Sequence, residues 1–339
     1  MSQYSNSPYR FLFSYHGFRS HLSATNIGTL SQYKIGTIKN IMNLVVTLIT
    51  SPERANITHR HIDQALTILD KAGCESKNPF WLAENISCDI EFNDTGPTRS
   101  LKFLQEGMKG LEIDIVVQSL ANRRKRLLLA DMDSTIVVGE TLDELAYYAG
   151  LRDQVAAITE RAMRGEIDFK SALRERVSML KGLSANALEE SLNKTKLTKG
   201  ASTLVKTMRA NGAYTVLVSG GFSFYTQAIA KIVGFNENRS NTMIIENGVL
   251  TGEIAEPILD REAKLETLKT ISTEKGIPLI DTMAIGDGAN DLPMILNAGI
   301  GVAFHAKPIV EEKAPAAIRY GDLTALLFVQ GYRLKEFKN

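Results

Sequence analysis

Beyond residue 120, short apolar runs alternate with segments in which apolar residues recur at helical spacing. The runs Leu127–Ala130, Tyr214–Val218 and Thr282–Ile285 are typical of strands buried on both faces of a parallel sheet. At least one helical segment separates each run from the next. This alternation predicts an α/β fold with an open parallel sheet for residues 121–339.

Three of the helical segments, 140–149, 151–163 and 167–180, come directly after the first predicted strand. They predict a helical cap, about 140–198, inserted into the sheet domain. In the third segment, Arg176 falls within an apolar stripe that includes Phe169. An arginine in this position either extends its charged end to water or binds an anion, and the spacing alone leaves both readings open.

Residues 43–119 follow a different order: strand, helix, two strands, helix and strand. This order predicts a ferredoxin-like α+β domain over residues 42–120. The segment resembles ACT modules, which are small regulatory domains that bind amino acids, but it carries no motif that requires a ligand. We expect it to serve interaction or dimerisation, as in a homodimer, with ligand sensing as the alternative.

Residues 1–41 contain no acidic residue, whereas Arg10, Arg19, Lys34 and Lys39 are basic. Such a composition resembles a transit peptide. An over-extended start, with translation beginning at Met42, explains it equally well. We therefore assign this segment neither a fold nor a chemical role.

Composition and charge narrow the function classes. The length of 339 residues suggests two domains, and a net charge of +1 gives no general attraction to nucleic acid. The basic cluster Arg123–Arg126 is expected to be a solvated linker, because no aromatic residue is interleaved to stack bases. No apolar run is long enough to span a membrane. Cys74 and Cys88 have neither zinc nor disulfide spacing, which favours a reducing, cytoplasmic setting.

Polar groups follow each of the three predicted buried strands. Asp131 and Asp133 follow the first, Ser219 and Gly220 the second, and Asp287 the third. The carboxyl ends of parallel strands share one edge of a sheet, so these groups are expected to meet there. Neighbouring carboxylates require a shared cation or proton, and Mg²⁺ prefers oxygen ligands and readily carries phosphate. The alternative for the first pair is a polar turn in which Asp133 or Ser134 caps a helix.

Lys264 adds a positive charge to this set. It is predicted in the first turn of a helix, 260–275, where the helix dipole disfavours a cation. A nearby negative group would explain its position, and a solvated surface lysine is the alternative. Phosphoryl transfer requires an in-line nucleophile, neutralised phosphate oxygens and a proton donor, all of which this set can supply. A carboxylate can itself be the nucleophile, through an aspartyl-phosphate.

Four motifs in this order resemble those of the haloacid dehalogenase superfamily and, within it, the phosphoserine phosphatases. They are Asp131-Met-Asp-Ser-Thr135, Ser219-Gly-Gly221, Lys264 and Gly286-Asp-Gly-Ala-Asn-Asp291. The resemblance implies a Rossmann-like sheet with a helical cap after its first strand. It also implies Mg²⁺-dependent hydrolysis of O-phospho-L-serine, the last step of serine biosynthesis. The alternatives are a phosphatase of another small phosphomonoester and a non-catalytic amino-acid sensor.

The same resemblance implies a role for each motif residue. Asp131 would be the nucleophile, and Asp133 the general acid and then the general base. Mg²⁺ would bind the Asp131 carboxylate, the Asp133 backbone carbonyl and Asp287, with Asp291 as a supporting residue. The substrate would contact residues from both the sheet and the cap. Glu140 would bind its ammonium and Arg176 its carboxylate, while Met163 and Phe169 would cover the rest of it. Its phosphate would be bound by Ser219, Gly220, Lys264 and Asn290.

Overall fold

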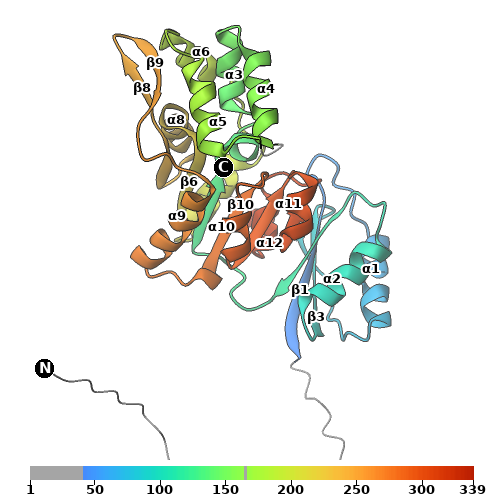
Figure 1. Ribbon diagram of the computed structural model, residues 1–339. Helices are drawn as coiled ribbons and strands as arrows, with labels where there is room; N and C mark the ends of the chain where they lie inside the picture. The colour runs from blue at the N-terminus through green and yellow to red at the C-terminus, as the bar shows by residue number, and fades with distance from the viewer. Residues whose placement is uncertain (1–40, 164–165) are drawn as a thin grey trace, which may run out of the picture. The chain divides into compact units, whose positions relative to one another are not determined.

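The computed structural model describes residues 41–163 and 166–339, except for the side chain of Met163. The expectations for residues 1–40 lie outside this range and stay predictions. The described residues belong to one compact unit, 40–339. They form a six-stranded parallel sheet, a four-stranded antiparallel sheet and a two-stranded hairpin (Figure 1). The predicted α/β class is therefore confirmed, whereas the predicted domain boundaries stay predictions.

The parallel sheet has the strand order β12-β11-β10-β5-β6-β7. In chain order its strands are β5 (Leu127–Asp131), β6 (Tyr214–Phe222), β7 (Glu237–Asn241), β10 (Thr282–Gly286), β11 (Ile300–Phe304) and β12 (Ala316–Ile318). The first strand, β5, therefore pairs with both the second and the fourth, β6 and β10. This is the Rossmann order, in which the direction of sheet growth reverses beside the first strand and leaves a crevice there.

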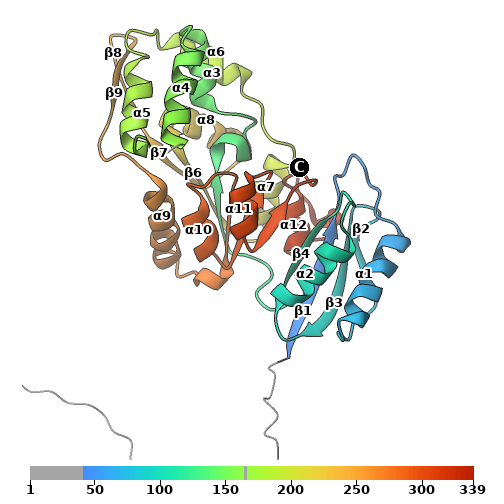
Figure 2. The same cartoon turned by 45° about the vertical axis from the view of Figure 1, so that its right-hand side comes forward.

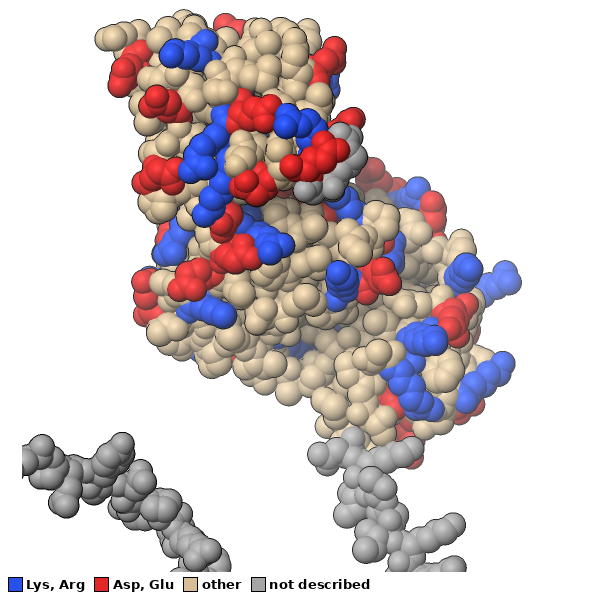
Figure 3. Space-filling view, viewed as in Figure 1, with Lys and Arg blue, Asp and Glu red and all other residues tan. Residues whose placement is uncertain are grey.

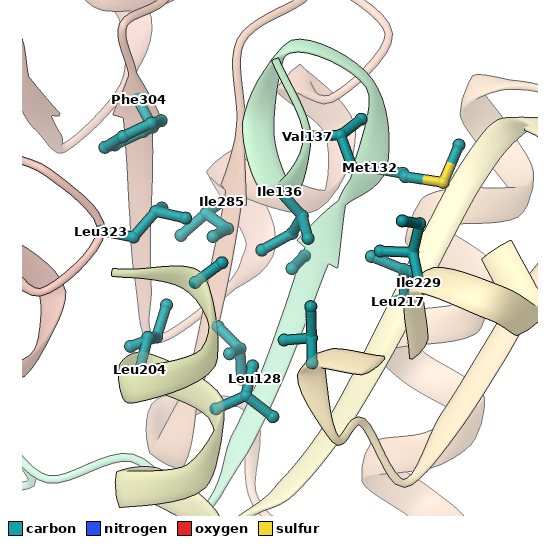
Figure 4. Packing of buried hydrophobic residues seen from close by; sticks show 14 of the residues in the cluster. Leu128, Met132, Ile136, Val137, Leu204, Leu217, Ile229, Ile285, Phe304 and Leu323 are labelled. Carbon is teal, nitrogen blue, oxygen red and sulfur yellow. The ribbon is translucent and has the colours of Figure 1, made fainter. Parts of the chain in front are cut away.

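Alternate residues of β5 pack on opposite faces of the sheet, because successive strand side chains point to opposite sides. Leu128 belongs to the core cluster that contains Leu204 of α7 (Ala201–Ala210) and Ile229 of α8 (Ser223–Val233) (Figure 4). Leu129 belongs to a second cluster, with Leu268 of α9 (Arg261–Glu274). Helices thus cover both faces, which explains why the run is apolar throughout. The remaining core helices are α10 (Leu292–Asn297), α11 (Pro308–Lys313) and α12 (Ala325–Val329).

A helical cap lies between β5 and β6 in the chain, as predicted. It consists of α3 (Thr141–Tyr148), α4 (Arg152–Met163), α5 (Phe169–Ser178) and α6 (Asn186–Lys194), and the hairpin of β8 (Met243–Glu246) and β9 (Val249–Ile254) packs against α5 (Figure 2). The chain enters and leaves the cap through two paired segments, in which Val138 N–H donates to Lys196 C=O and Thr198 N–H donates to Ile136 C=O.

Helix α6 and strand β7 were not predicted from the sequence. The sequence of α6, Asn186–Lys194, is short and mostly polar, and β7 is the edge strand Glu-Asn-Arg-Ser-Asn, which carries no apolar alternation. Both elements gain their stability from neighbours, since α6 packs on α3 and β7 pairs with β6. Local periodicity therefore contained little signal for either of them.

The N-terminal part has the predicted ferredoxin-like order. Its elements are β1 (Met42–Ile49), α1 (His59–Lys71), β2 (Phe80–Ala83), β3 (Ser87–Asp94), α2 (Pro97–Gly107) and β4 (Asp114–Ser119), in an antiparallel sheet of order β2-β3-β1-β4. One face carries its own core, to which Leu44, Leu69 and Leu104 contribute. On the other face, Ile49 and Val116 join the core cluster that includes α12. The specific relation to ACT modules stays a prediction.

The prediction that the basic cluster Arg123–Arg126 is a solvated linker was wrong for two of its four residues. Arg124 and Arg126 are exposed, but Arg123 and Lys125 are not. The Arg123 side chain is 11% exposed and pairs with Asp89 of β3, with 2.5 Å between Nη1 and Oδ2. It also donates to the Val329 carbonyl in α12. Lys125 is buried and donates to two backbone carbonyls. Except for Asn122, whose carbonyl Lys125 binds, these partners lie far along the chain, so the composition of the cluster did not reveal them.

On the face shown in Figure 3, acidic and basic side chains are interspersed. Cys74 and Cys88 are buried free thiols. Among residues 41–163 and 166–339, none of the helices combines the length and the apolar character that a membrane span requires.

Candidate active site

Asp131, Ser219 and Asp287 lie at or just beyond the carboxyl ends of β5, β6 and β10, as the sequence predicted. These three strands are adjacent in the sheet, in the order β10-β5-β6. Asp131 ends β5, which stands at the reversal of strand order, the place where open α/β sheets bind ligands. All three side chains are at most 9% exposed. The strand order is therefore what brings these distant residues to one place.

Lys264 forms the centre of a buried charge cluster. Its Nζ lies 2.5 Å from Asp131 Oδ1 and 2.6 Å from Asp291 Oδ1. Burial favours the neutral amine, but the two carboxylates more than offset this effect and raise the pKa of Lys264 above its usual range. The alternative of a solvated surface lysine is thus excluded. The negative groups that its position at the start of α9 suggested are Asp131 and Asp291.

Asp131, Asp287 and Asp291 offer oxygen atoms that all lie within 4.8 Å of one another, a spacing suited to one metal ion. Burial, followed by repulsion from Asp291, raises the pKa of Asp131 and raises that of Asp287 to about 6. When all three carboxylates are ionised, Lys264 neutralises only one charge. Hard oxygen donors with excess negative charge are the chemistry that Mg²⁺ and Ca²⁺ prefer, so the residues fit a divalent cation.

The predicted ligand set differs from this cluster in one member. The Asp133 side chain is not part of the cluster, and only the Asp133 backbone carbonyl was predicted to bind the metal. Asp291 takes part in the cluster, but its two oxygens already accept hydrogen bonds from Lys264 Nζ and Gly288 N–H. A Cβ atom at Gly286 would lie 2.3 Å from Asp291 Cγ, so only glycine lets this carboxylate pack beside β10.

The Asp133 carboxylate is held by three donors. Its Oδ1 accepts from Thr141 N–H at 2.8 Å and from Thr141 Oγ1 at 2.7 Å, and its Oδ2 accepts from Ser219 Oγ at 3.0 Å. Ser219 Oγ in turn accepts from Gly221 N–H at 2.8 Å. The polar-turn alternative was thus partly right, because Asp133 does bind the N-terminus of a helix. It does so while lying beside Ser219 of the next strand.

Glu140 and Arg176 both face the site from the cap. Glu140 Oε1 accepts from Ser134 Oγ at 2.9 Å. The Glu140 side chain is exposed, yet the surrounding protein displaces part of the water that would solvate its charged form. Together with repulsion from Asp133, this raises the pKa of Glu140 to about 7. Because the site already contains several carboxylates, a cationic ligand group would be favoured beside Glu140.

The Arg176 side chain is half-buried and makes two long hydrogen bonds, to Ala172 O at 3.3 Å and to Thr159 Oγ1 at 3.4 Å. Burial lowers the pKa of its guanidinium, and the charges of Asp143, Glu140 and Asp133 oppose that lowering. The guanidinium therefore points among the carboxylates at the start of α3 rather than outward to bulk water. Because both of its hydrogen bonds are long, the guanidinium can give them up for shorter ones to an anionic ligand group.

Phe169 places the cap directly over the sheet. A Cβ atom at Gly220 would lie 3.2 Å from the Phe169 ring, so the ring rests on the backbone of the Ser219–Gly221 loop. Asn290 is half-buried in the loop after β10, beside Gly288. Met163 ends α4, and its side chain lies outside the described part of the chain. The substrate role predicted for Met163 stays a prediction.

Two residues of the site were not singled out in the sequence. Thr141 binds Asp133 with both its backbone and its hydroxyl group, and Asp143 is the carboxylate with the strongest charge effect on Arg176. Both follow Glu140 in the first turn of α3. Their spacing from Glu140 was visible, but a polar first turn is common to many helices, so it did not indicate a site.

Comparisons with known proteins agree with this geometry. A family model described as haloacid dehalogenase-like hydrolase matches residues 128–296. A phosphoserine phosphatase of Archaeoglobus fulgidus is 43% identical over 243 residues, which cover 71% of this chain and 70% of that protein. The chain belongs to the haloacid dehalogenase-like hydrolases. The cluster of Asp131, Asp287 and Asp291, together with Lys264, thus lies within the matched segment of this family.

Further relatives in this family extend the likeness. A phosphoserine phosphatase of Streptomyces coelicolor is 37% identical over 272 residues, covering 79% of this chain and 66% of that protein. A structure of a probable phosphoserine phosphatase from Vibrio cholerae, in unliganded form, has a TM-score of 0.71 at 28% identity and covers 88% of both chains. A structure described as a phospho-aspartyl intermediate analogue of phosphoserine phosphatase has a TM-score of 0.57 at 40% identity, covering 60% of this chain and 98% of that one.

Proposed function

We propose that this enzyme is a phosphoserine phosphatase, which hydrolyses O-phospho-L-serine to serine and phosphate. The reaction would be the last step of serine biosynthesis. The observation that carries the proposal is the meeting of Asp131, Asp133 and Lys264 at one end of the sheet, in a chain 43% identical to a phosphoserine phosphatase. The likeness to a phospho-aspartyl intermediate analogue supports a covalent route.

In the first step, Asp131 attacks the phosphorus atom and the bond from phosphorus to the seryl oxygen breaks. The seryl oxygen leaves with the bonding electrons and takes a proton from Asp133, which is the general acid. In the second step, a water oxygen attacks phosphorus and gives a proton to Asp133. The bond between phosphorus and Asp131 then breaks, which releases phosphate and restores both carboxyl groups to their starting states.

Lys264 supports both steps by its charge. Its ammonium lies against the nucleophile and is held there by Asp291, so it need not reorganise as charge develops on the phosphoryl oxygens. Ser219 and the backbone of Gly220 and Gly221 provide a loop beside it in which hydroxyl and N–H donors can approach an anion closely. Asn290 would complete the phosphate site from the loop after β10.

Mg²⁺ is the proposed metal, held by Asp131, Asp287 and the backbone carbonyl of Asp133. When bound, it neutralises charge on the phosphoryl oxygens. The support from this chain is the set of neighbouring carboxylates that Lys264 alone does not neutralise. Asp291 would act as a supporting residue, because both of its oxygens already have hydrogen-bond donors.

Substrate selection would rest on opposite charges in the cap. Glu140 would pair with the serine ammonium and Arg176 with the serine carboxylate, while Phe169 and Met163 would cover the pocket. A phosphatase of sugar phosphates would have no use for such a pair. The amino-acid sensor is not favoured, because a sensor without catalysis would not need Asp131, Asp287 and Asp291 to converge on one metal site.

Phosphate release from a panel of phosphomonoesters tests the proposal. The panel contains phosphoserine, phosphothreonine, phosphoethanolamine and glycerol 3-phosphate, each assayed with Mg²⁺ and with a chelator. Phosphoserine should give the highest kcat/KM, and the chelator should abolish turnover. A preference for a phosphomonoester that lacks either the ammonium or the carboxylate would overturn the assignment.

The remaining partner and location assignments are proposals of the same kind. The substrate is a small molecule, and a homodimer through the N-terminal sheet is proposed because its β2 edge is unpaired among the described strands. Light scattering on the purified enzyme tests the dimer, and a monomer at micromolar concentration would exclude it.

A reducing, cytoplasmic setting is proposed from the two free cysteines.

A further inference from the structure

Thr141 binds one oxygen of Asp133 with two separate groups. Its N–H lies 2.8 Å and its hydroxyl 2.7 Å from Asp133 Oδ1. Thr141 itself is 4% exposed, so water competes little for these hydrogen bonds. Oδ1 is therefore fixed, and rotation of the carboxylate would break two bonds at once.

Thr141 also lies at the junction between the sheet and the cap. It is the first residue of α3 and follows the paired entry segment that contains Val138. The preceding residue, Glu140, makes no side-chain hydrogen bond to the start of α3. Asp133 instead accepts the first N–H of this helix from outside. The position of the cap and the orientation of Asp133 are thus set by the same contacts.

The second oxygen, Oδ2, points to the other side. It lies 3.0 Å from Ser219 Oγ, and a Cβ atom at Gly221 would also lie 3.0 Å from it. Oδ2 therefore faces the Ser219–Gly221 loop, where the substrate phosphate is proposed to bind. Of the two oxygens, Oδ1 faces Thr141 and Oδ2 faces this loop.

We infer that Thr141 is a positioning residue that holds Asp133 Oδ1, so that Oδ2 is the oxygen that transfers the proton. This inference rests on the proposed function. As the bond from phosphorus to the seryl oxygen breaks, the proton moves from Oδ2 to the seryl oxygen and the electron pair of the O–H bond stays on Asp133. Without the Thr141 hydroxyl, the carboxyl group rotates more freely and proton transfer is less often aligned.

A comparison of substrates with different leaving groups tests the role of Thr141. A purely structural role of Thr141 would not change their relative rates. A seryl alkoxide leaves poorly without a proton, whereas p-nitrophenolate is stable as an anion and needs little help from a general acid. General acid catalysis contributes about 10²–10⁴-fold to a reaction that needs it. Loss of alignment should therefore slow phosphoserine hydrolysis far more than p-nitrophenyl phosphate hydrolysis.

The experiment compares kcat/KM for the two substrates in the wild-type enzyme and in Thr141→Val, which keeps the N–H but loses the hydroxyl. We expect a loss of about tenfold for phosphoserine and less than about twofold for p-nitrophenyl phosphate. Thr141→Ser should restore the wild-type ratio. Thr195→Val is the matched control, because the Thr195 hydroxyl, at the C-terminal end of α6, donates to Ser191 O, and the ratio of the two substrates should be unchanged.

Equal losses on both substrates, or no loss on either, would overturn the inference. If Thr141→Val does not fold, Thr141→Ala is compared in the same way. Failure of the proposed function is visible separately, because wild-type enzyme would then not prefer phosphoserine. The best alkyl phosphate in the panel would in that case replace phosphoserine in the comparison. Equal losses on that substrate and on p-nitrophenyl phosphate, or no loss on either, would again overturn the inference about Thr141.

Discussion

Lys264 Nζ lies 2.5 Å from Asp131 Oδ1, although the two residues are 133 positions apart in the chain. Lys264 is in the first turn of α9, and Asp131 ends β5. The helix dipole disfavours a lysine at this end of a helix. The buried carboxylates of Asp131 and Asp291 offset that cost, so the contact accounts for a residue that is locally out of place. It also places a fixed positive charge beside the proposed nucleophile.

Replacing the proposed nucleophile, Asp131, should abolish turnover without unfolding the protein. In Asp131→Asn, Lys264 keeps its contact with Asp291, so the cluster retains one ion pair. An amide cannot form the phosphoenzyme and is a poorer metal ligand than a carboxylate. We expect no phosphate release, and no label on protein quenched after mixing with radiolabelled phosphoserine. In the wild-type enzyme, label that resists hydroxylamine would contradict an aspartyl-phosphate.

Arg176→Ala should reduce activity on substrates that carry a carboxylate. A desolvated hydrogen bond to a charged group contributes about 1.5–3 kcal/mol, so kcat/KM for phosphoserine should fall about 10–200-fold. Phosphoethanolamine lacks the carboxylate and should be affected much less. Arg174→Ala is the control, because Arg174 lies on the same helix, is 52% exposed and pairs with Glu256. An unchanged ratio of the two substrates in Arg176→Ala would remove the proposed carboxylate site.

The metal-free protein should become more stable as the pH falls from 7.5 to 5.5. The folded pKa of Asp287 is raised to about 6 from a usual value of 3.8, so the folded state binds a proton before the unfolded state does. Stability is therefore lowest above the folded pKa and rises as the pH falls through it. The expected gain is on the order of 1 kcal/mol, measured by urea unfolding in chelator.

Asp287→Asn tests the origin of this gain. The variant should lose much of the pH effect and most of the stabilisation that Mg²⁺ produces at pH 7.5, because both depend on the same carboxylate. In the wild-type protein, Mg²⁺ should stabilise less at pH 5.5 than at pH 7.5, since protons compete for the site. Equal stabilisation by Mg²⁺ in wild type and Asp287→Asn would place the metal elsewhere.

Breaking the buried ion pair between Arg123 and Asp89 should destabilise the protein. Arg123→Ala leaves Asp89, whose side chain is 9% exposed, without its partner, and such a loss costs about 3–5 kcal/mol. Arg126→Ala is the control within the same basic cluster. Arg126 is 57% exposed and 3.9 Å from Asp281, so its loss should cost at most about 1 kcal/mol. Similar urea unfolding midpoints for the two variants would show that burial does not distinguish them.

Much of the site could be predicted because its residues belong to short local sequence patterns. The apolar run before Asp131 identified a strand buried on both faces, and the polar residues at the ends of three such strands indicated one shared edge. The position of Lys264 was already anomalous as a local feature, since it conflicts with the helix dipole. The motif order then connected these residues to a known chemistry.

The tertiary structure alone decided which partners these residues have. The strand order β10-β5-β6 sets Asp287 and Ser219 on either side of Asp131, and nothing in the local periodicity specifies that order. Arg123 looked like part of a solvated linker, but Asp89 and α12 bury it. In the sequence, Thr141 has only the features of an ordinary first-turn residue. The fold brings it to Asp133, which accepts its two hydrogen bonds. Periodicity reports which face of an element is apolar, whereas burial and pairing depend on contacts between segments far apart in the chain.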